Sequence, residues 1–488
     1  MRIAGMALSA MSAAVIFLVT SVAAADWSAV MRLADNDLAA VAGRIEVVRV
    51  NGQVSHLEYY HAQTDRHGPQ QQLPNWPLPI VEPRPYGSLT SVENGRFFKS
   101  KGAGGLLLKL DRQSGDLNLL PYHSITIHGV WRGAWQLAVA DERLAQQQDN
   151  YLLGALTRDV GSQTFSLQQL PASFDRARGR YLVFRLESAA GSLELKGVTL
   201  QRETVAGQQV GRGAWLWDMR QVIGHEQAVV EKLQRYAITR LYLQVDDHLQ
   251  RYLPFLQRAR AAGVAVYALD GAPDAHLQSE VLLRRIAAVA AFNRAYPQFA
   301  FSGFQLDVEP YLQKDFSVDQ PRHVTAYLAL LDEARRRAGV HLPVSAAIPF
   351  WFDHVATAGR DLAQEVLRRV DELVVMAYRR DYGEAVKIST SILAAAEWAG
   401  KPVWLGVELT ALPDEDHLEL LPALVGEQSD VELAGRRWRA ARSYQVKGAE
   451  LSFAGAQELL PALLKQRPEF GSFQGWVLHS LEVLEPAP

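Results

Sequence analysis

The sequence predicts two folded parts, a jelly-roll-like β-sandwich followed by a (β/α)8 TIM barrel. Between residues 106 and 200, short runs of alternating apolar side chains are separated by turn residues, a pattern typical of an antiparallel sandwich. After residue 212 a strand pattern is followed by a helix pattern, and this unit recurs eight times, as in a (β/α)8 barrel. A doubly wound open sheet is the alternative, but no Gly-x-Gly-x-x-Gly turn follows the first strand, which disfavours its dinucleotide-binding form.

The start of the chain has the pattern of a secretory signal peptide. Arg2 gives a positive charge, residues 7–19 are mostly apolar, and small residues at 23–25 precede Asp26. We therefore expect residues 1–25 to be a signal peptide that is cleaved on export, the alternative being an uncleaved anchor helix. The chain has no cysteine, which excludes disulfides and thiolate metal sites. Together these features predict a periplasmic or secreted bacterial protein.

The first part is expected over residues 26–205, as a loop-rich segment followed by the sandwich. The loop-rich segment, 28–85, contains six prolines, which interrupt helices and central strands. Four aromatic residues are candidates for stacking on sugars if the sandwich binds carbohydrate: Tyr122, Trp131, Trp135 and Tyr181. The expected strands are 106–110, 124–129, 136–140, 165–167, 180–186 and 193–200.

The second part, the barrel, is expected over residues 212–488. Its predicted strands are 214–218, 240–245, 264–270, 303–309, 343–349, 373–378, 403–408 and 475–481. Amphipathic helices are predicted between them at 226–236, 252–262, 280–295, 324–338, 362–369 and 385–399.

The charge of the chain is nearly balanced, with 50 Lys and Arg against 53 Asp and Glu among 488 residues. No basic field along the surface would attract nucleic acid or anionic lipid, so we expect neither as a partner. A polysaccharide or oligosaccharide is the expected partner, no segment after the signal peptide is predicted to span a membrane, and no motif indicates a cofactor.

A pair of carboxylates ends the fourth predicted barrel strand. Asp307 and Glu309 are separated by one apolar residue and, with Gln305, point to the same side of the strand. Barrel enzymes keep their chemistry at the carboxyl ends of the strands. Two carboxyl groups sharing a cavity oppose each other's ionisation, so that one can stay protonated as an acid, as sugar hydrolysis requires.

Other polar and aromatic residues are expected at the same rim. Tyr378 and Glu408 end the sixth and seventh strands, and we assign them to catalysis with the carboxyl pair. Flat sugar faces stack on aromatic rings, and the rim aromatics are Trp217, Tyr311, Phe350, Trp351, Phe352, Tyr382, Trp404 and Trp476. The expected substrate-binding residues are Asp218, Asp270, Trp217, Gln305, Trp351 and His479.

Three motifs make the barrel part resemble the chitinase-like glycoside hydrolases. Their fourth strand carries Asp-Gly-x-Asp-x-Asp-x-Glu, where residues 302–309 read Ser-Gly-Phe-Gln-Leu-Asp-Val-Glu. Their sixth carries Met-x-Tyr-Asp, where 376–379 read Met-Ala-Tyr-Arg, and their eighth ends Gly-x-Met-x-Trp-Ser-Leu-Asp, where 475–482 read Gly-Trp-Val-Leu-His-Ser-Leu-Glu. The resemblance implies that Glu309 is the general acid/base, Asp307 its neighbouring carboxylate and Tyr378 a hydrogen-bond donor to the reacting centre.

A second group of barrel glycosidases has a glutamate at the end of the fourth strand and a nucleophilic glutamate at the end of the seventh. Glu309 and Glu408 occupy those positions, but the asparagine that precedes the acid/base in that group is Val308 here. Retaining hydrolysis would need these carboxyls about 5 Å apart, and about 8 Å would suit inversion.

The sequence therefore favours an exported glycoside hydrolase. A glycan-binding barrel without activity is the alternative, because Ser302 and Gln305 replace two aspartates of the motif. Metal-assisted hydrolysis or deacetylation by His479, Asp218 and Asp270 is the third hypothesis, although the clustered histidines of such sites are missing.

Overall fold

The computed structural model describes residues 42–61, 75–78, 81–93, 96–109, 119, 122–141, 151–157, 160–171, 174, 176, 179–188, 190–201, 209–313, 315–316, 319–355, 357, 361–423, 429, 431–433 and 436–484. The chain divides into two compact units, of which one joins Met1–His61 to Gly207–Pro488 and the other is Ala62–Ala206. The expected signal peptide, residues 1–25, lies outside the described residues. Among the helices that are described, none is long and apolar enough to cross a membrane.

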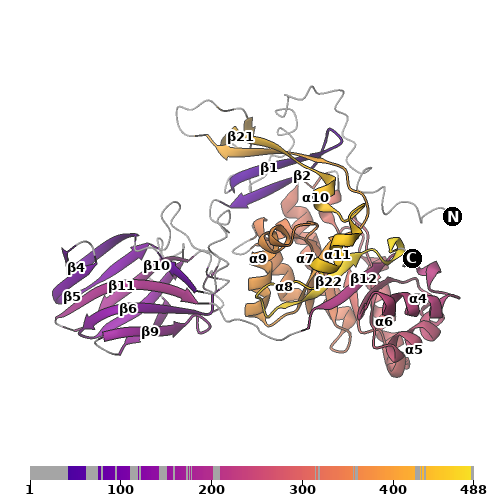
Figure 1. The fold of residues 1–488 in the computed structure, drawn as a ribbon, viewed down its shortest axis with the longest axis horizontal. Coiled ribbons are helices and arrows are strands. Elements are labelled where there is room, and N and C mark those ends of the chain that lie inside the picture. The colour runs from indigo at the N-terminus through magenta and orange to yellow at the C-terminus, as the bar shows by residue number, and fades with distance from the viewer. Residues whose placement is uncertain are drawn as a thin grey trace. The chain divides into compact units, whose positions relative to one another are not determined.

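The first unit contains a closed barrel of eight parallel strands, as predicted (Figure 1). The barrel closes where β12 pairs with β22, and Gly475 is required there because a Cβ at this position would lie 2.1 Å from the carbonyl oxygen of Gly211. The open sheet is therefore excluded. The strands are β12 (Gly211–Leu216), β13 (Arg240–Gln244), β14 (Ala265–Asp270), β15 (Gly303–Leu306), β16 (Val344–Pro349), β17 (Glu372–Met376), β18 (Val403–Glu408) and β22 (Phe473–His479).

Six helices, one after each of the first six barrel strands, lie close to their predicted positions, and each turns its apolar side chains toward the barrel. In the shortest, Asp361 caps the amino end by accepting a hydrogen bond from the backbone N–H of Gln364 (2.7 Å), and Leu362 and Val366 are buried. The helices are α4 (Glu226–Arg235), α5 (Leu253–Ala261), α6 (Glu280–Ala295), α7 (Gln320–Ala338), α8 (Leu362–Arg369) and α9 (Tyr382–Ala399).

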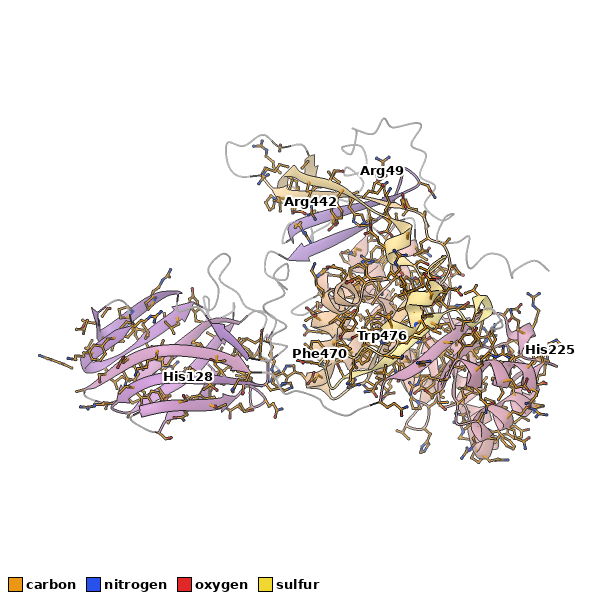
Figure 2. The ribbon with its side chains drawn as sticks, viewed as in Figure 1. Arg49, His128, His225, Arg442, Phe470 and Trp476 are labelled. Atoms are coloured by element: carbon orange, nitrogen blue, oxygen red, sulfur yellow. The ribbon has the colours of Figure 1, made fainter. Side chains whose placement is uncertain are left out.

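Large side chains fill the barrel interior. Near the amino ends of the strands, the Arg240 guanidinium lies between the rings of Tyr267 (4.6 Å) and Trp404 (4.7 Å) and forms an ion pair with Glu372. Trp404 is thus a core residue, and its expected place at the rim is wrong. Trp476 is also fully buried within the barrel unit, where its indole N–H donates to Gln466 O (3.0 Å) (Figure 2). Packed side chains therefore close the barrel at the amino ends of its strands. A site can lie only at the carboxyl ends.

A second sheet in this unit was not predicted. It has the strand order β2-β1-β19-β21-β20 and pairs an early hairpin with an insertion between β18 and β22 (Figure 1). The expectation of a loop-rich segment is therefore wrong over residues 42–61. The strands are β1 (Ala42–Val50), β2 (Gln53–His61), β19 (Glu415–Pro422), β20 (Val431–Leu433) and β21 (Arg436–Val446).

A buried ionic cluster ties the hairpin to the insertion. His417 bonds Glu46 across the sheet (2.7 Å) and Glu415 beside it (3.2 Å), and the Tyr444 hydroxyl donates to Glu46. Burial alone would lower the pKa of His417, but the two carboxylates raise it to about 9. At neutral pH the cluster therefore holds an imidazolium between carboxylates, and removing any one partner would leave a buried charge uncompensated. The backbone of β2 runs beside η7 (Pro310–Leu312) and η8 (Phe350–His354), two short helices that follow barrel strands.

The second unit is an antiparallel sheet of nine strands, with the order β8-β7-β10-β5-β11-β6-β9 and with β3 and β4 paired to β11 and β5. The predicted antiparallel region is confirmed, and the jelly-roll arrangement stays a prediction. The strands are β3 (Asn75–Leu78), β4 (Val81–Glu93), β5 (Phe97–Lys109), β6 (Ser124–Arg132), β7 (Trp135–Asp141), β8 (Tyr151–Leu156), β9 (Val160–Ser166), β10 (Gly179–Leu186) and β11 (Gly191–Gln201).

The two ends of this sheet meet. The Gln163 side chain of β9 donates to Ala155 O of β8 (2.7 Å) and accepts from the backbone N–H of Thr157 (2.8 Å). The sheet therefore folds back on itself and covers its own edges. Of the aromatics expected to stack on sugars, Tyr122, Trp131 and Trp135 are fully buried. They form the core of the unit, so the expectation that they present faces to a ligand is wrong.

Candidate active site

The carboxyl pair lies just after β15, at the carboxyl-terminal mouth of the barrel. Asp307 and Glu309 are both half-buried, with the buried Val308 between them. The backbone N–H of Asp307 donates to Asp270 O at the end of β14 (3.2 Å). Gly271 is required beside it, because a Cβ there would lie 1.9 Å from the Asp307 carbonyl oxygen. Close packing of the two strand ends therefore fixes the backbone of the pair.

Burial raises the pKa of both carboxyl groups. That of Asp307 rises to about 8, because burial is reinforced by the charge of Glu309 and only partly opposed by His479. The pKa of Glu309 is also raised by burial, against a hydrogen bond from Tyr311 and the charge of His479. Carboxyl groups that interact this strongly titrate as a pair. The raised pKa values favour a pair that keeps a proton near neutral pH.

Tyr311 joins this pair to the aromatic rim. Its hydroxyl donates to Glu309 Oε1, and its ring packs edge-on against Trp351, 5.2 Å between centroids, and against Phe352 at 6.2 Å. Trp351 is 3% exposed and Phe352 1%. The expectation that Trp351 stacks on substrate is therefore wrong, because its ring is covered by protein. It supports the tyrosine that contacts Glu309.

His479 lies in an aromatic box at the end of β22. Its ring stacks on Tyr378 (6.0 Å, 15°) and meets Trp215 (5.6 Å) and Trp217 (6.2 Å) edge-on. Burial alone would lower the pKa of His479, but the hydrogen bond and charge of Glu408, with the charge of Asp307, raise it above the ordinary value. The half-buried His479 ring therefore lies near the carboxyl pair, and the carboxylates of Glu408 and Asp307 favour its protonated form.

Glu408 is occupied by hydrogen bonds. Its Oε1 accepts from the backbone N–H of Leu409 (2.9 Å) and from the N–H (2.7 Å) and hydroxyl (2.6 Å) of Thr410, and its Oε2 bonds His479 Nδ1 (2.5 Å). The residue is 1% exposed. A nucleophile must reach the sugar, so this setting favours a positioning role, in which Glu408 holds the His479 ring and its charge.

Asp218 and Asp270 are paired with arginines. Asp218 caps the short helix after β12 and binds the Arg220 guanidinium through both oxygens (2.7 and 2.9 Å). Asp270 forms an ion pair with Arg285, and burial raises its pKa. The expected roles in substrate binding are therefore not supported, since these carboxylates already have charged partners. Gln305 is likewise fully buried, where it accepts from the Trp215 indole N–H (2.7 Å).

The residues of the metal hypothesis do not share a centre. His479 bonds Glu408, Asp218 bonds Arg220, and Asp270 bonds Arg285. Over the described part of the chain, no three His, Cys, Asp or Glu side chains are grouped to hold a metal ion.

The sequence prediction missed three contributors to the site. Glu482 accepts hydrogen bonds from the backbone N–H groups of Trp217 (2.5 Å) and Asp218 (3.0 Å) and so holds the turn that carries Trp217. Tyr311 was noted only as a rim aromatic, and its contact with Glu309 depends on the turn at Pro310. Tyr327 of α7 is fully buried, and among the described residues its hydroxyl has no hydrogen-bond partner. The charges of Asp307 and Glu309 help to raise the pKa of Tyr327, after burial.

Comparisons with known proteins find structural likeness to barrel glycoside hydrolases. The spore cortex-lytic enzyme SleL of Bacillus cereus matches with 14% identity and a TM-score of 0.31, over 54% of this chain and 60% of that enzyme. Chitinases of Rhizomucor miehei (15%, 0.32) and Chromobacterium violaceum (13%, 0.30) match over 56% and 57% of this chain and 94% and 96% of theirs.

The match thus spans less than two thirds of SleL. No protein-family model and no curated protein sequence matches the chain. The likenesses agree with the distant resemblance that the strand-end motifs indicate, but at such TM-scores they carry no argument about the reaction.

Proposed function

We propose that this protein is a glycoside hydrolase that cleaves O-glycosidic bonds of a polysaccharide. The observation that carries the proposal is the half-buried Asp307–Glu309 pair at the mouth of the barrel, where burial raises the pKa of Asp307 to about 8 and that of Glu309 above its ordinary value. An acid that stays protonated beside a carboxylate is what glycosidic cleavage requires.

In the proposed reaction Glu309 delivers the proton of the pair to the leaving oxygen. As the bond to the leaving oxygen breaks, the Asp307 carboxylate stabilises the positive charge that develops at the anomeric carbon. Water then forms the new bond to that carbon and gives a proton back to Glu309. The Tyr311 hydroxyl orients Glu309 by donating to it. In this proposal Tyr378, which stacks on His479, donates a hydrogen bond to the reacting sugar.

The test is turnover by the Glu309→Gln variant on a panel of polysaccharides. Glutamine keeps the shape and the acceptor for Tyr311 but cannot deliver a proton. We expect turnover to fall by a factor of about 10² to 10⁴, with binding retained. Glu384→Gln, which changes a glutamate on the outer face of α9 paired with Lys387 (3.3 Å), is the matched control. Cleavage by Glu309→Gln at the native rate would rule out the acid role.

A second candidate function is glycan binding without hydrolysis. It is favoured by Ser302 and Gln305, which stand where the motif has aspartates, and by the hydrogen bonds that occupy Glu408. If the native protein cleaves nothing on the panel but binds one of its glycans with micromolar affinity, this function replaces the first.

We also propose that the protein is exported to the periplasm or the medium, on the pattern of residues 1–25. Its substrate would then be a polysaccharide outside the cytoplasm. Amino-terminal sequencing of the exported protein should find a start at Asp26 or within a few residues, and an intact Met1 would contradict the proposal.

A further inference from the structure

Two consecutive arginines follow β17 at the mouth of the barrel. Arg379 and Arg380 are both half-buried, and neither lies within ion-pair distance of a carboxylate among the residues described. The Arg379 side chain donates from Nη1 to Tyr378 O (2.8 Å), and its guanidinium lies over the Phe350 ring, 5.1 Å from the centroid. Arg380 is held through its backbone, whose N–H donates to Glu450 O (2.7 Å). Within the described part of the chain, Arg379 Nη1 to Tyr378 O is the hydrogen bond that these two guanidinium groups donate.

Other arginines near the barrel strand ends have acidic partners. Arg220 binds Asp218 through two hydrogen bonds, and Arg285 binds Asp270. The acid next to the pair in sequence, Asp381, instead caps α9 by accepting from the backbone N–H of Glu384 (2.9 Å). A guanidinium group that is partly removed from water is stabilised by an anion that neutralises its charge. An anion that arrives with the ligand would supply that neutralisation.

The arginines are continuous with the candidate active site through Tyr378. The tyrosine accepts from Arg379 through its carbonyl and stacks on His479 through its ring. His479 already bonds the Glu408 carboxylate at 2.5 Å, and a carboxylate of the Asp307–Glu309 pair would repel an anion placed over it. A negatively charged group of the ligand is therefore expected at Arg379.

We propose that Arg379, with Arg380, forms a subsite for the carboxylate of an acidic sugar, so that the preferred glycan contains uronic acid residues. This inference rests on the proposed action on a glycan. A guanidinium presents its N–H groups in a planar fork that matches a carboxylate with two parallel hydrogen bonds. The Phe350 ring supports the plane of that fork. The chain carries Arg379 at the position where the resembled motif has aspartate, so this position is positive instead of negative.

The experiment measures binding by calorimetry, with the full chain and matched pairs of tetrasaccharides. The acidic probes are tetramers of galacturonic, mannuronic and glucuronic acid, and each neutral probe is the same tetramer after reduction of its carboxyl groups. We expect at least one acidic tetramer to bind about tenfold or more tightly than its reduced partner, as charged hydrogen bonds imply. The preference should weaken as salt is added.

Arg379→Gln should lose that preference and leave the affinity for the reduced tetramer unchanged. Arg220→Gln is the control, because Arg220 also follows a barrel strand but is paired with Asp218, and it should keep the preference. Equal binding of every acidic tetramer and its reduced partner would overturn the proposal, as would a preference that survives in Arg379→Gln. If Arg379→Gln loses the preference while the native protein hydrolyses no polysaccharide, the subsite is supported and the hydrolase proposal is contradicted. If the native protein hydrolyses a polysaccharide but binds acidic and reduced tetramers equally, the hydrolase proposal is supported and the subsite is contradicted.

Discussion

The ends of β15 and β18 place glutamates in opposite settings within one barrel. Glu309 after β15 is half-buried and accepts one side-chain hydrogen bond, from Tyr311, while burial raises its pKa. Glu408 at the end of β18 is fully buried and accepts three bonds at one oxygen and bonds His479 with the other. In the sequence both are glutamates at the ends of predicted barrel strands. The hydrogen bonds that each carboxyl group accepts therefore distinguish the two residues. Glu309, with one, can react, whereas Glu408, with four, positions its neighbours.

The largest structural effect that would test this comparison is the loss of stability in Glu408→Gln. The amide cannot balance the charge of His479, and breaking a buried ion pair leaves a charge uncompensated. We expect the free energy of unfolding to fall by about 3 kcal/mol, measured by denaturant titration followed by tryptophan fluorescence. Glu309→Gln is the matched variant and should change it by less than about 1 kcal/mol. Equal losses would remove the distinction between the two strand ends.

A smaller effect is expected at the β15 end, in the pH dependence of the free energy of unfolding. The pKa of Asp307 is about 8 in the folded protein against an ordinary 3.8. The folded state therefore holds a proton that the unfolded chain has released, and its stabilising effect is lost as pH rises between these values. Asp307→Asn has no such proton, so its free energy of unfolding relative to the wild type should rise by roughly 2 kcal/mol from pH 5 to pH 8.

The measurement is a series of denaturant titrations across this pH range for both proteins. A difference that stays constant with pH would mean that the Asp307 carboxyl is ionised throughout and holds no proton in this range.

The barrel was predictable because its signals are local. Each strand is a short apolar run, each helix has its own apolar face, and α6 and α8 begin and end where the pattern predicts. The sheet formed by the hairpin and the insertion was not predictable in this way. Its partners, such as Glu46 and His417, lie 371 residues apart, and no local pattern identifies a partner at that distance.

The sequence by itself determined which residues meet at the mouth of the barrel. Parallel strands end at one rim, so Asp307, Glu309, Tyr378, Glu408 and His479 had to lie near one another once the eight strands were recognised. Tertiary structure alone decided which of these side chains remain available. Asp218 is paired with Arg220, and Asp270 with Arg285. The Glu408 carboxylate is hydrogen-bonded to Thr410 and His479. Arg379 has no acidic partner in the described chain. The reason is physical: a carboxylate's reactivity depends on its partners and its exposure to water, and both are set by contacts between distant segments.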